Sequence, residues 1–434
     1  MRDQAEFVPI EVERLRIGLF IQLNLSWVDH PFFSNSFKIA NPKQLATLKK
    51  LGVREILYCP AKSDCAPLPA AEAGKQAEVA AGDNEAAMPS ADVDEEELAA
   101  LALKRDRIER LKRHKESVRR CEQALLVAGR QIKAINENLF SKSNDAVRVA
   151  TQLINQMADA LLTDKDVAIH AINDKVGSEE VYYHALNVTV LSLLLARELD
   201  LPDAQLRQVG LGALFHDIGK RELPDWLLRK RDGLTRTEMN LLAQHVAFGE
   251  KIGAKLELSA DAMDIIRMHH ESADGSGYPR GLRGEDIPLP CRIVSVVNCF
   301  DNLCNPRNLD MALTPHEAVS QMFAKARAQF DSRVLTTFIR FMGVYPPGTL
   351  VRLSNDFWGL VMTVNMRTPL KPGIMLFDPA IPKEEAILLD LKDEPQINIS
   401  KACRPSQLPE EAIDYLSPRK RVTYYFDEDA DGGA

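Results

Sequence analysis

The chain has 434 residues, more than one compact core normally holds, and a net charge of −8, so we expect two to four domains and no general nucleic-acid or DNA partner. Its seven cysteines are odd in number and form no CxxC pair, which fits a reduced, cytoplasmic compartment and indicates neither a disulfide framework nor a thiolate zinc site. The N-terminus lacks a cationic segment before an apolar run, and no apolar stretch of about 18 residues follows, so no membrane span is expected.

Residues 1–65 predict a small α/β module. A helix is expected over residues 42–51, because Asn41 is a suitable N-cap and Gly52 a suitable end, and short β-rich runs are expected at residues 8–12, 19–25 and 56–58. The composition of residues 66–94, rich in Ala, Glu, Gly, Pro and Asp, is typical of a flexible linker.

A long helical pattern covers residues 95–143. Its apolar spacing fits three alternatives: a coiled-coil stalk, a helix packed on the next domain, or a solvated amphipathic helix. The pattern alone does not select one of them.

Residues 144–342 show helical periodicity nearly throughout, which predicts an all-helical domain with its own core. Thr314, followed by Pro315 and Glu317, predicts a capping box. The helices are expected at residues 146–163, 178–199, 206–218, 237–255, 260–270, 289–303, 314–327 and 332–342. Residues 343–434 alternate β-rich runs with turns and predict a small C-terminal β module and tail. The predicted fold class is therefore mainly α, with small modules at both ends.

The helical segment also concentrates groups that bind metal ions. His216 and Asp217 end the apolar run 211–215, and burying such a pair is costly unless a metal ion compensates it. Imidazole and carboxylate are ligands of borderline divalent ions. We therefore expect both residues to be metal ligands.

Other candidates are less decisive one by one. Glu180 precedes His184 by four positions, so both can approach one ion, although the two alone fit an ordinary surface pair better. His245 fits a core histidine equally well. His269 and His270 point about 100° apart on a helix and can serve two neighbouring ions, or one ion and its substrate.

The sequences HDIGK at residues 216–220 and HHESADGSGYP at residues 269–279, in this order, resemble the HD-GYP proteins, the metal-dependent cyclic di-GMP phosphodiesterases of bacteria. The similarity covers about residues 175–345 and implies an HD-type helical phosphohydrolase domain. Residues 30–37, HPFFSNSF, resemble the small domain of unassigned role that precedes this domain in one subgroup.

The resemblance implies hydrolysis of cyclic di-GMP to pGpG, and further to GMP, with two or three divalent ions, Fe or Mn, as cofactors. A nitrogen and oxygen donor set without sulfur suits these metals. Asp217 would bridge the ions and, with Lys220 near a phosphate oxygen, carry the catalysis. The implied ligands are Glu180, His184, His216, Asp217, His245, His269 and His270, and the implied substrate contacts are Lys220, Arg307, Gly277, Tyr278 and Pro279.

Two residues depart from the family pattern. Asn298 stands where the family usually has an aspartate ligand, and an amide is a weaker, neutral donor. Asp310 follows Arg307 where a basic residue is usual, and a carboxylate there repels phosphate. Both favour an alternative, a catalytically weak protein that senses cyclic di-GMP or a partner protein. Another phosphorylated nucleotide as substrate, protein partners at the turn 277–279 or the N-terminal module, and a homodimer are further alternatives.

Overall fold

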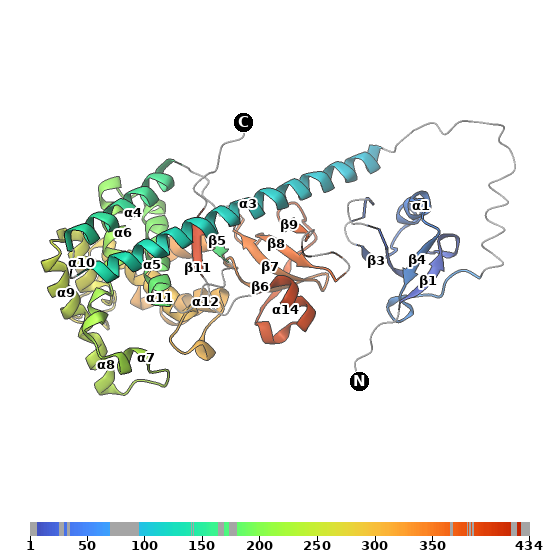
Figure 1. Cartoon of the computed structure of the whole chain (residues 1–434). Helices are drawn as coiled ribbons and strands as arrows, with labels where there is room; N and C mark the ends of the chain where they lie inside the picture. Colours follow the sequence, from blue (N-terminus) through green and yellow to red (C-terminus); the bar gives the residue numbers. More distant parts are fainter. Residues whose placement is uncertain are drawn as a thin grey trace. The chain divides into compact units, whose positions relative to one another are not determined.

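The computed structural model describes most of the chain (Figure 1). The described residues are 7–25, 30–32, 35–69, 95–139, 141, 143–163, 169–172, 180–364, 368–379, 381, 383, 386–417 and 423–426. Most of the predicted linker therefore lies outside the described residues.

The N-terminal module is an antiparallel sheet with one helix. Strands β1 (Val8–Glu11), β2 (Phe20–Gln22), β3 (Ser36–Lys38) and β4 (Glu55–Tyr58) lie in the order β1-β4-β2-β3. Helix α1 (Pro42–Lys50) begins after Asn41, whose side-chain oxygen accepts a hydrogen bond from the Gln44 backbone N–H at 2.9 Å. The predicted N-cap is thus confirmed. The core between sheet and helix is formed by buried apolar residues, among them Ile10, Leu19, Ile21, Leu48 and Ile56.

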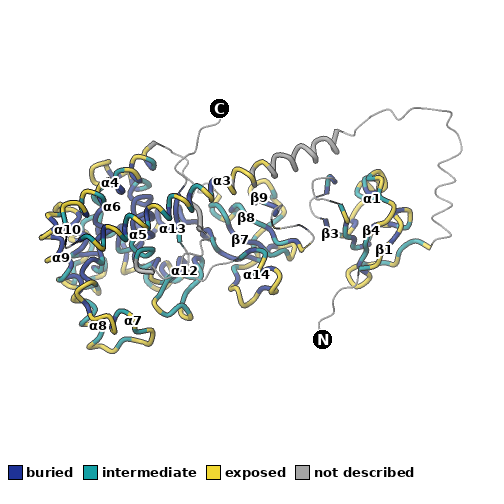
Figure 2. Tube along the Cα trace, in the orientation of Figure 1, coloured by how far each residue is buried: buried dark blue, intermediate teal, exposed yellow. Residues whose placement is uncertain are grey.

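The helical domain has helix α5 at its centre. Residues 186–196 of α5 are buried, and its sequence is apolar almost all round, as expected for a helix surrounded by others. Figure 2 colours the interior of this domain as buried. It packs on α6, α11 and α13. The helices are α3 (Glu95–Asn138), α4 (Ser143–Thr163), α5 (Glu180–Glu198), α6 (Asp203–Phe215), α7 (Asp225–Arg229), α8 (Arg236–Ala243), α9 (His245–Lys255), α10 (Ala260–Met268), α11 (Leu289–Cys304), α12 (Pro315–Lys325) and α13 (Ser332–Met342).

The structure selects among the alternatives for the long helix. Apolar side chains in the second half of α3 recur every three or four residues and are buried in the core of the helical domain. This half of α3 is therefore packed on the domain that follows it. The buried positions are Cys121, Leu125, Ala128, Ile132 and Ile135, and Leu139 directly after the helix is buried as well.

Two helix boundaries differ from expectation, and both concern the metal-ligand candidates. The helix expected over 206–218 ends at Phe215, and a 3-10 helix, η4 (Ile218–Glu222), follows Asp217. The helix expected over 237–255 is two helices, because the chain turns between α8 and α9. Local periodicity does not show these breaks, since the apolar spacing continues through them. The capping box at Thr314 is confirmed.

The C-terminal part contains a five-stranded sheet. Its strands, in the order β10-β6-β7-β8-β9, are β6 (Leu350–Leu353), β7 (Trp358–Thr363), β8 (Gly373–Phe377), β9 (Leu388–Asp390) and β10 (Ile399–Cys403), and helix α14 (Glu410–Leu416) follows.

The last strand belongs to the helical domain instead. Strand β11 (Thr423–Phe426) pairs antiparallel with β5 (Ile169–Ile172), between α4 and α5, and its aromatic side chains lie in the helical core. Neither strand was predicted, because a single short strand whose partner is far away in sequence leaves no local signal.

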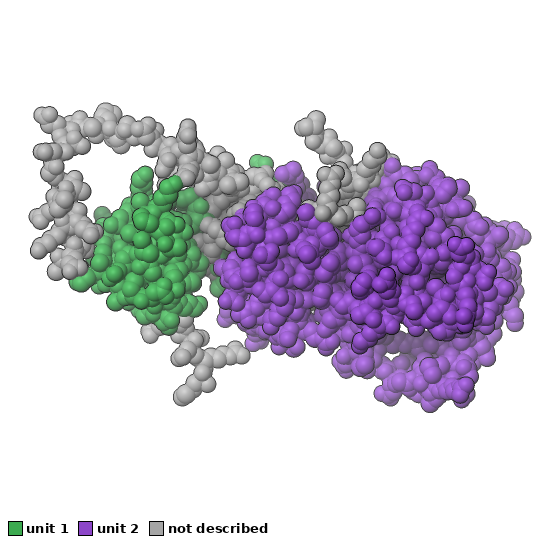
Figure 3. Space-filling model, turned by 180° about the vertical axis from the view of Figure 1, so that it is seen from behind, with its two compact units in different colours: residues 1–112, 377–388 green, residues 113–376, 389–434 purple. Residues whose placement is uncertain are grey.

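The chain forms two compact units, residues 1–112 with 377–388 and residues 113–376 with 389–434 (Figure 3). The finer domain boundaries expected from the sequence remain predictions. None of the described helices combines the length and the apolar character that a membrane crossing needs.

Candidate metal centre

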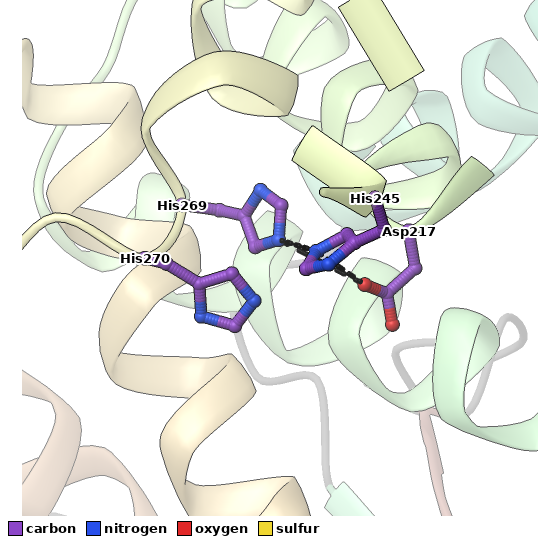
Figure 4. Close-up of side chains that lie close together, drawn as sticks. All are labelled: Asp217, His245, His269 and His270. Atoms are coloured by element: carbon purple, nitrogen blue, oxygen red, sulfur yellow. Dashed lines mark hydrogen bonds and ion pairs between the residues drawn. The ribbon is translucent and has the colours of Figure 1, made fainter. Parts of the chain in front are cut away.

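The structure brings together six of the predicted ligands at the ends or inner faces of five helical segments. His184 lies on α5, His216 and Asp217 join α6 to η4, His245 begins α9, and His269 and His270 follow α10. Figure 4 shows four of them, with the ring of His245 between that of His269 and the carboxylate of Asp217. Helix ends project side chains away from the regular packing, so residues from distant segments can meet.

A close backbone contact holds η4 against α9. A Cβ atom at Gly219 would lie 1.9 Å from the carbonyl oxygen of His245 and 2.3 Å from the backbone nitrogen of Gly249. Only glycine permits this approach. The glycine of the HDIGK motif therefore keeps Asp217 and Lys220 beside His245.

The carboxylate of Asp217 divides the histidines into two groups. Its Oδ2 atom lies 3.4 Å from Nε2 of His184 and 3.4 Å from Nε2 of His216. Its Oδ1 atom lies 3.4 Å from Nε2 of His245 and 3.8 Å from Nε2 of His269. Each set of ligand atoms fits within 4.8 Å, the second set including His270. We call His184 and His216 the Oδ2 group, and His245, His269 and His270 the Oδ1 group.

The imidazoles are oriented by hydrogen bonds at Nδ1. Nδ1 of His216 is 2.7 Å from the carbonyl oxygen of Ala213, and Nδ1 of His245 is 2.7 Å from that of Leu242. Nδ1 of His269 contacts carbonyl oxygens of its own helix at 3.1 and 3.2 Å. A proton on Nδ1 leaves the Nε2 lone pair free, which is the arrangement that metal-binding histidines adopt.

Three of the candidate donor atoms lack a hydrogen-bond partner among the described residues, and the spacing of two others suits a shared metal ion. Nε2 of His184, Nε2 of His216 and Oδ1 of Asp217 are buried without a hydrogen-bond partner, which is costly unless a ligand satisfies them. Nε2 of His245 lies 3.3 Å from Nε2 of His269. Two ligands at about 2.1 Å from one ion lie roughly 3.0 to 3.4 Å apart. The cluster can therefore hold metal ions.

The Oδ1 group is electrically neutral near pH 7. Burial lowers the pKa of His269 and of His270 well below the usual value, and charge on neighbouring histidines lowers both further. Burial also lowers the pKa of His245. Neutral imidazoles bind metal ions without first losing a proton.

The Oδ2 group carries charge. Burial acts to lower the pKa of His184, but the carboxylates of Asp217 and Asp301 outweigh it and raise this pKa to about 9. Burial likewise disfavours the charged form of Asp217, yet Lys220 and His216 outweigh it and hold the pKa of this carboxyl well below its usual value. An ionised Asp217 at the centre is what a bridging ligand requires.

Lys220 and Arg307 lie within electrostatic reach of Asp217. Lys220 Nζ forms an ion pair with Asp217 Oδ2 and remains partly exposed. Arg307 Nη1 donates to the carbonyl oxygen of Leu227 at 3.2 Å. Burial lowers the pKa of Arg307, and the charge of Asp217 acts in the opposite direction. Asp310 lies in a short 3-10 helix, where its N–H donates to Asn308 Oδ1 at 3.1 Å.

The turn around residues 277–279 packs against His270, one of the candidate metal-binding residues. The ring of Tyr278 stacks on that of His270, with centroids 4.6 Å apart and planes 20° apart. The backbone N–H of Tyr278 also donates to the carbonyl oxygen of His270 at 3.1 Å. A Cβ at Gly277 would lie 2.3 Å from the backbone nitrogen of Ser272, so the turn requires glycine. A substrate contact of Gly277, Tyr278 or Pro279 remains a prediction.

Glu271 holds the same turn from within. Its buried carboxylate accepts hydrogen bonds from the backbone N–H groups of Arg280 at 2.7 Å and Leu282 at 2.8 Å. Glu271 is not among the residues for which the sequence predicts a role. A glutamate directly after two candidate ligands and before a glycine-rich turn is the signal that would have marked it.

Glu180 and Asn298 stay predicted ligands. Glu180 begins α5, and its side chain lies outside the described residues. Asn298 is buried on α11, where its Oδ1 accepts a hydrogen bond from Asn302 at 2.7 Å. One turn later, Asp301 Oδ2 lies 2.6 Å from Nδ1 of His184. Asp301 of α11 is therefore in direct contact with a candidate ligand.

Comparisons with known proteins agree with this geometry. A family model described as HD domain matches residues 146–334. Cyclic di-GMP phosphodiesterase PA4108 of Pseudomonas aeruginosa is 30% identical over 373 residues, which cover 85% of this chain and 84% of the relative. The chain belongs to the HD-GYP family. A second model, described as a domain of unknown function (DUF3391), matches residues 8–150 of this HD-GYP protein. This range includes residues 30–37, which resemble the small domain of unassigned role.

Two further relatives match shorter stretches of the HD-GYP chain. The cyclic di-GMP phosphodiesterase response regulator RpfG of Xanthomonas campestris is 37% identical over 149 residues, 34% of this chain and 39% of its own. The 3'3'-cGAMP-specific phosphodiesterase 2 of Vibrio cholerae is 30% identical over 185 residues, 42% of this chain and 35% of its own. The names of these relatives thus include two different cyclic dinucleotides.

Proposed function

We propose that the chain is a metal-dependent phosphodiesterase that hydrolyses cyclic di-GMP to pGpG. The observation that carries the proposal is the carboxylate of Asp217, whose two oxygens face separate groups of imidazole nitrogens. The Pseudomonas relative aligns with this chain over most of its length, and it is named a cyclic di-GMP phosphodiesterase.

The two groups would hold two divalent ions, with Asp217 as the ligand common to both. Fe or Mn suits a site of imidazole and carboxylate donors without sulfur. When bound, such ions lower the pKa of a coordinated water and offset charge on the phosphodiester. Glu180 and Asn298 are candidate additional ligands.

The chain's own cations would bind the substrate. Lys220, partly exposed beside Asp217, would contact a phosphate oxygen through its ammonium group. Arg307, held by the carbonyl oxygen of Leu227, would supply a second fixed positive charge. Cations fixed before the reaction stabilise developing negative charge without reorganisation.

A second candidate function is a sensor that binds cyclic di-GMP or a partner protein with little turnover. Asn298 and Asp310 favour it, because each replaces a group that the family resemblance associates with metal or phosphate binding. Substrate choice is a separate question, since a relative named for 3'3'-cGAMP shares similar identity.

The test combines metal analysis with product chromatography. The full chain is expressed with Fe or Mn, its metal content is measured, and cyclic di-GMP and 3'3'-cGAMP are offered in parallel. Two or three ions with pGpG formation support the enzyme, and tight nucleotide binding without product supports the sensor. Turnover of 3'3'-cGAMP alone would move the proposal to that substrate. The control is His316→Ala, which removes a histidine bonded to the carbonyl oxygen of Val344 and should retain the metal. A protein without bound metal would contradict the proposal.

A further inference from the structure

Asn187 is a buried polar residue on α5, three positions after His184, with 1% of its surface exposed. Both the nitrogen and the oxygen of its amide group form hydrogen bonds. Nδ2 donates to Asp301 Oδ1 at 2.7 Å, and Oδ1 accepts from the backbone N–H of Tyr424 at 3.0 Å. Asn187 therefore joins three segments: α5, α11 and strand β11.

Asp301 connects this amide to the metal centre. It is fully buried, and its Oδ2 lies 2.6 Å from Nδ1 of His184. Its Oδ1 accepts from Asn187 and, at 2.9 Å, from Nδ2 of Asn305. With both oxygens engaged, the carboxylate cannot rotate freely, so it fixes the direction of the imidazole and keeps a proton on Nδ1.

Strand β11 supplies the backbone N–H that donates to Asn187. Tyr424 is fully buried, its ring lies 6.0 Å from that of Phe300, and its hydroxyl donates to the carbonyl oxygen of Pro347 at 3.4 Å. The strand is held in register by pairing with β5. The backbone N–H that meets Asn187 is therefore rigidly placed by residues from the C-terminal end of the chain.

We propose that β11, Asn187 and Asp301 form a positioning network that aims Nε2 of His184 at the ion of the Oδ2 group. Strand β11 thereby contributes to metal binding by the HD domain. The inference rests on the proposed function, because it requires a metal ion in the Oδ2 group. Outer partners of metal-binding histidines typically contribute about 10-fold to 100-fold in metal affinity.

The test is Mn²⁺ binding to the full chain carrying Asn187→Leu, measured by calorimetry and by electron paramagnetic resonance. Leucine keeps the volume and removes both amide contacts. We expect the affinity of one ion to fall about 10-fold to 100-fold while the Oδ1 group keeps its ion. The spectrum should change from that of two magnetically coupled ions to that of an isolated ion. A merely structural residue would not remove one ion selectively.

Two further variants complete the design. Thr189→Val removes a different buried hydrogen bond on α5, from Thr189 Oγ1 to the carbonyl oxygen of Ala185 at 2.7 Å, and should bind both ions as the wild type does. If Asn187→Leu does not fold, Asp301→Asn, which preserves size, should show the same selective loss. Folded variants that keep both ions at wild-type affinity would overturn the network. A wild-type chain that binds no ion would instead overturn the proposed function, and this inference with it.

Discussion

The two histidine groups around Asp217 are built in different ways. In the Oδ1 group, His245 and His269 are held by carbonyl oxygens of residues three or four positions earlier in the sequence. In the Oδ2 group, His184 is held by Asp301, 117 positions away. His245 and His269, like His216 of the Oδ2 group, are thus oriented by local helix structure, whereas His184 depends on a tertiary contact and carries charge.

The largest effect is expected from Asp217→Ala, because it disrupts the Oδ1 group and the Oδ2 group at the same time. The substitution removes the carboxylate that faces both groups, so it should abolish binding of both ions and lower turnover by at least about a thousandfold. Metal analysis and product formation from cyclic di-GMP measure this. Retention of one tightly bound ion would show that the groups are independent and that Asp217 is not shared.

The difference in charge predicts a different pH dependence of metal binding. With a pKa of about 9, His184 is protonated at neutral pH in the metal-free chain, so an ion must displace one proton. Affinity at the Oδ2 group should therefore rise about tenfold per pH unit below 9 and level off above it. The Oδ1 group, whose histidines have lowered pKa values, should show no such rise above pH 7.

Mn²⁺ titrations between pH 6.5 and 8.5 measure this contrast. His216→Ala is the matched control, because it removes a ligand of the Oδ2 group and leaves the ion of the Oδ1 group. Its remaining affinity should be almost independent of pH across this range. Equal slopes for both ions in the wild type would contradict the assignment of the displaced proton to His184.

The same contrast explains what the sequence could predict. The ligand types, the HDIGK and HHE motifs and the helical domain are readable because each is local. The break after Phe215 that frees His216 and Asp217, and the strand pair β5 and β11, are not readable. Both depend on packing between segments far apart in sequence, such as the contact of Gly219 with His245. For the same reason Asn187 carried no signal, since its partners lie on α11 and β11.

A smaller effect is expected at the turn that supports the Oδ1 group. Tyr278→Ala removes the ring stacked on His270, and such contacts typically contribute about 0.5 to 1.5 kcal/mol, so metal affinity should fall about 2-fold to 10-fold. Tyr278→Phe keeps the stack and should retain the affinity. If both variants lose turnover but keep the metal, the tyrosine hydroxyl acts on substrate instead.

An effect of similar size and opposite direction is expected from Asn298→Asp, which tests whether the metal centre lacks a carboxylate ligand. The buried side chain already accepts a hydrogen bond from Asn302, so aspartate preserves that contact while adding a carboxylate one turn before Asp301. Two buried carboxylates so close are unfavourable unless a cation lies between or beside them.

The variant should therefore melt at a lower temperature than the wild type without metal, and should gain about 2-fold to 10-fold in Mn²⁺ affinity if the added charge reaches the ion. Melting curves with and without Mn²⁺ separate the two effects. A lower melting temperature under both conditions, with no gain in affinity, would mean that residue 298 faces away from the ion. A low turnover rate would then have to originate at the substrate contacts near Asp310 and not at the metal ligands.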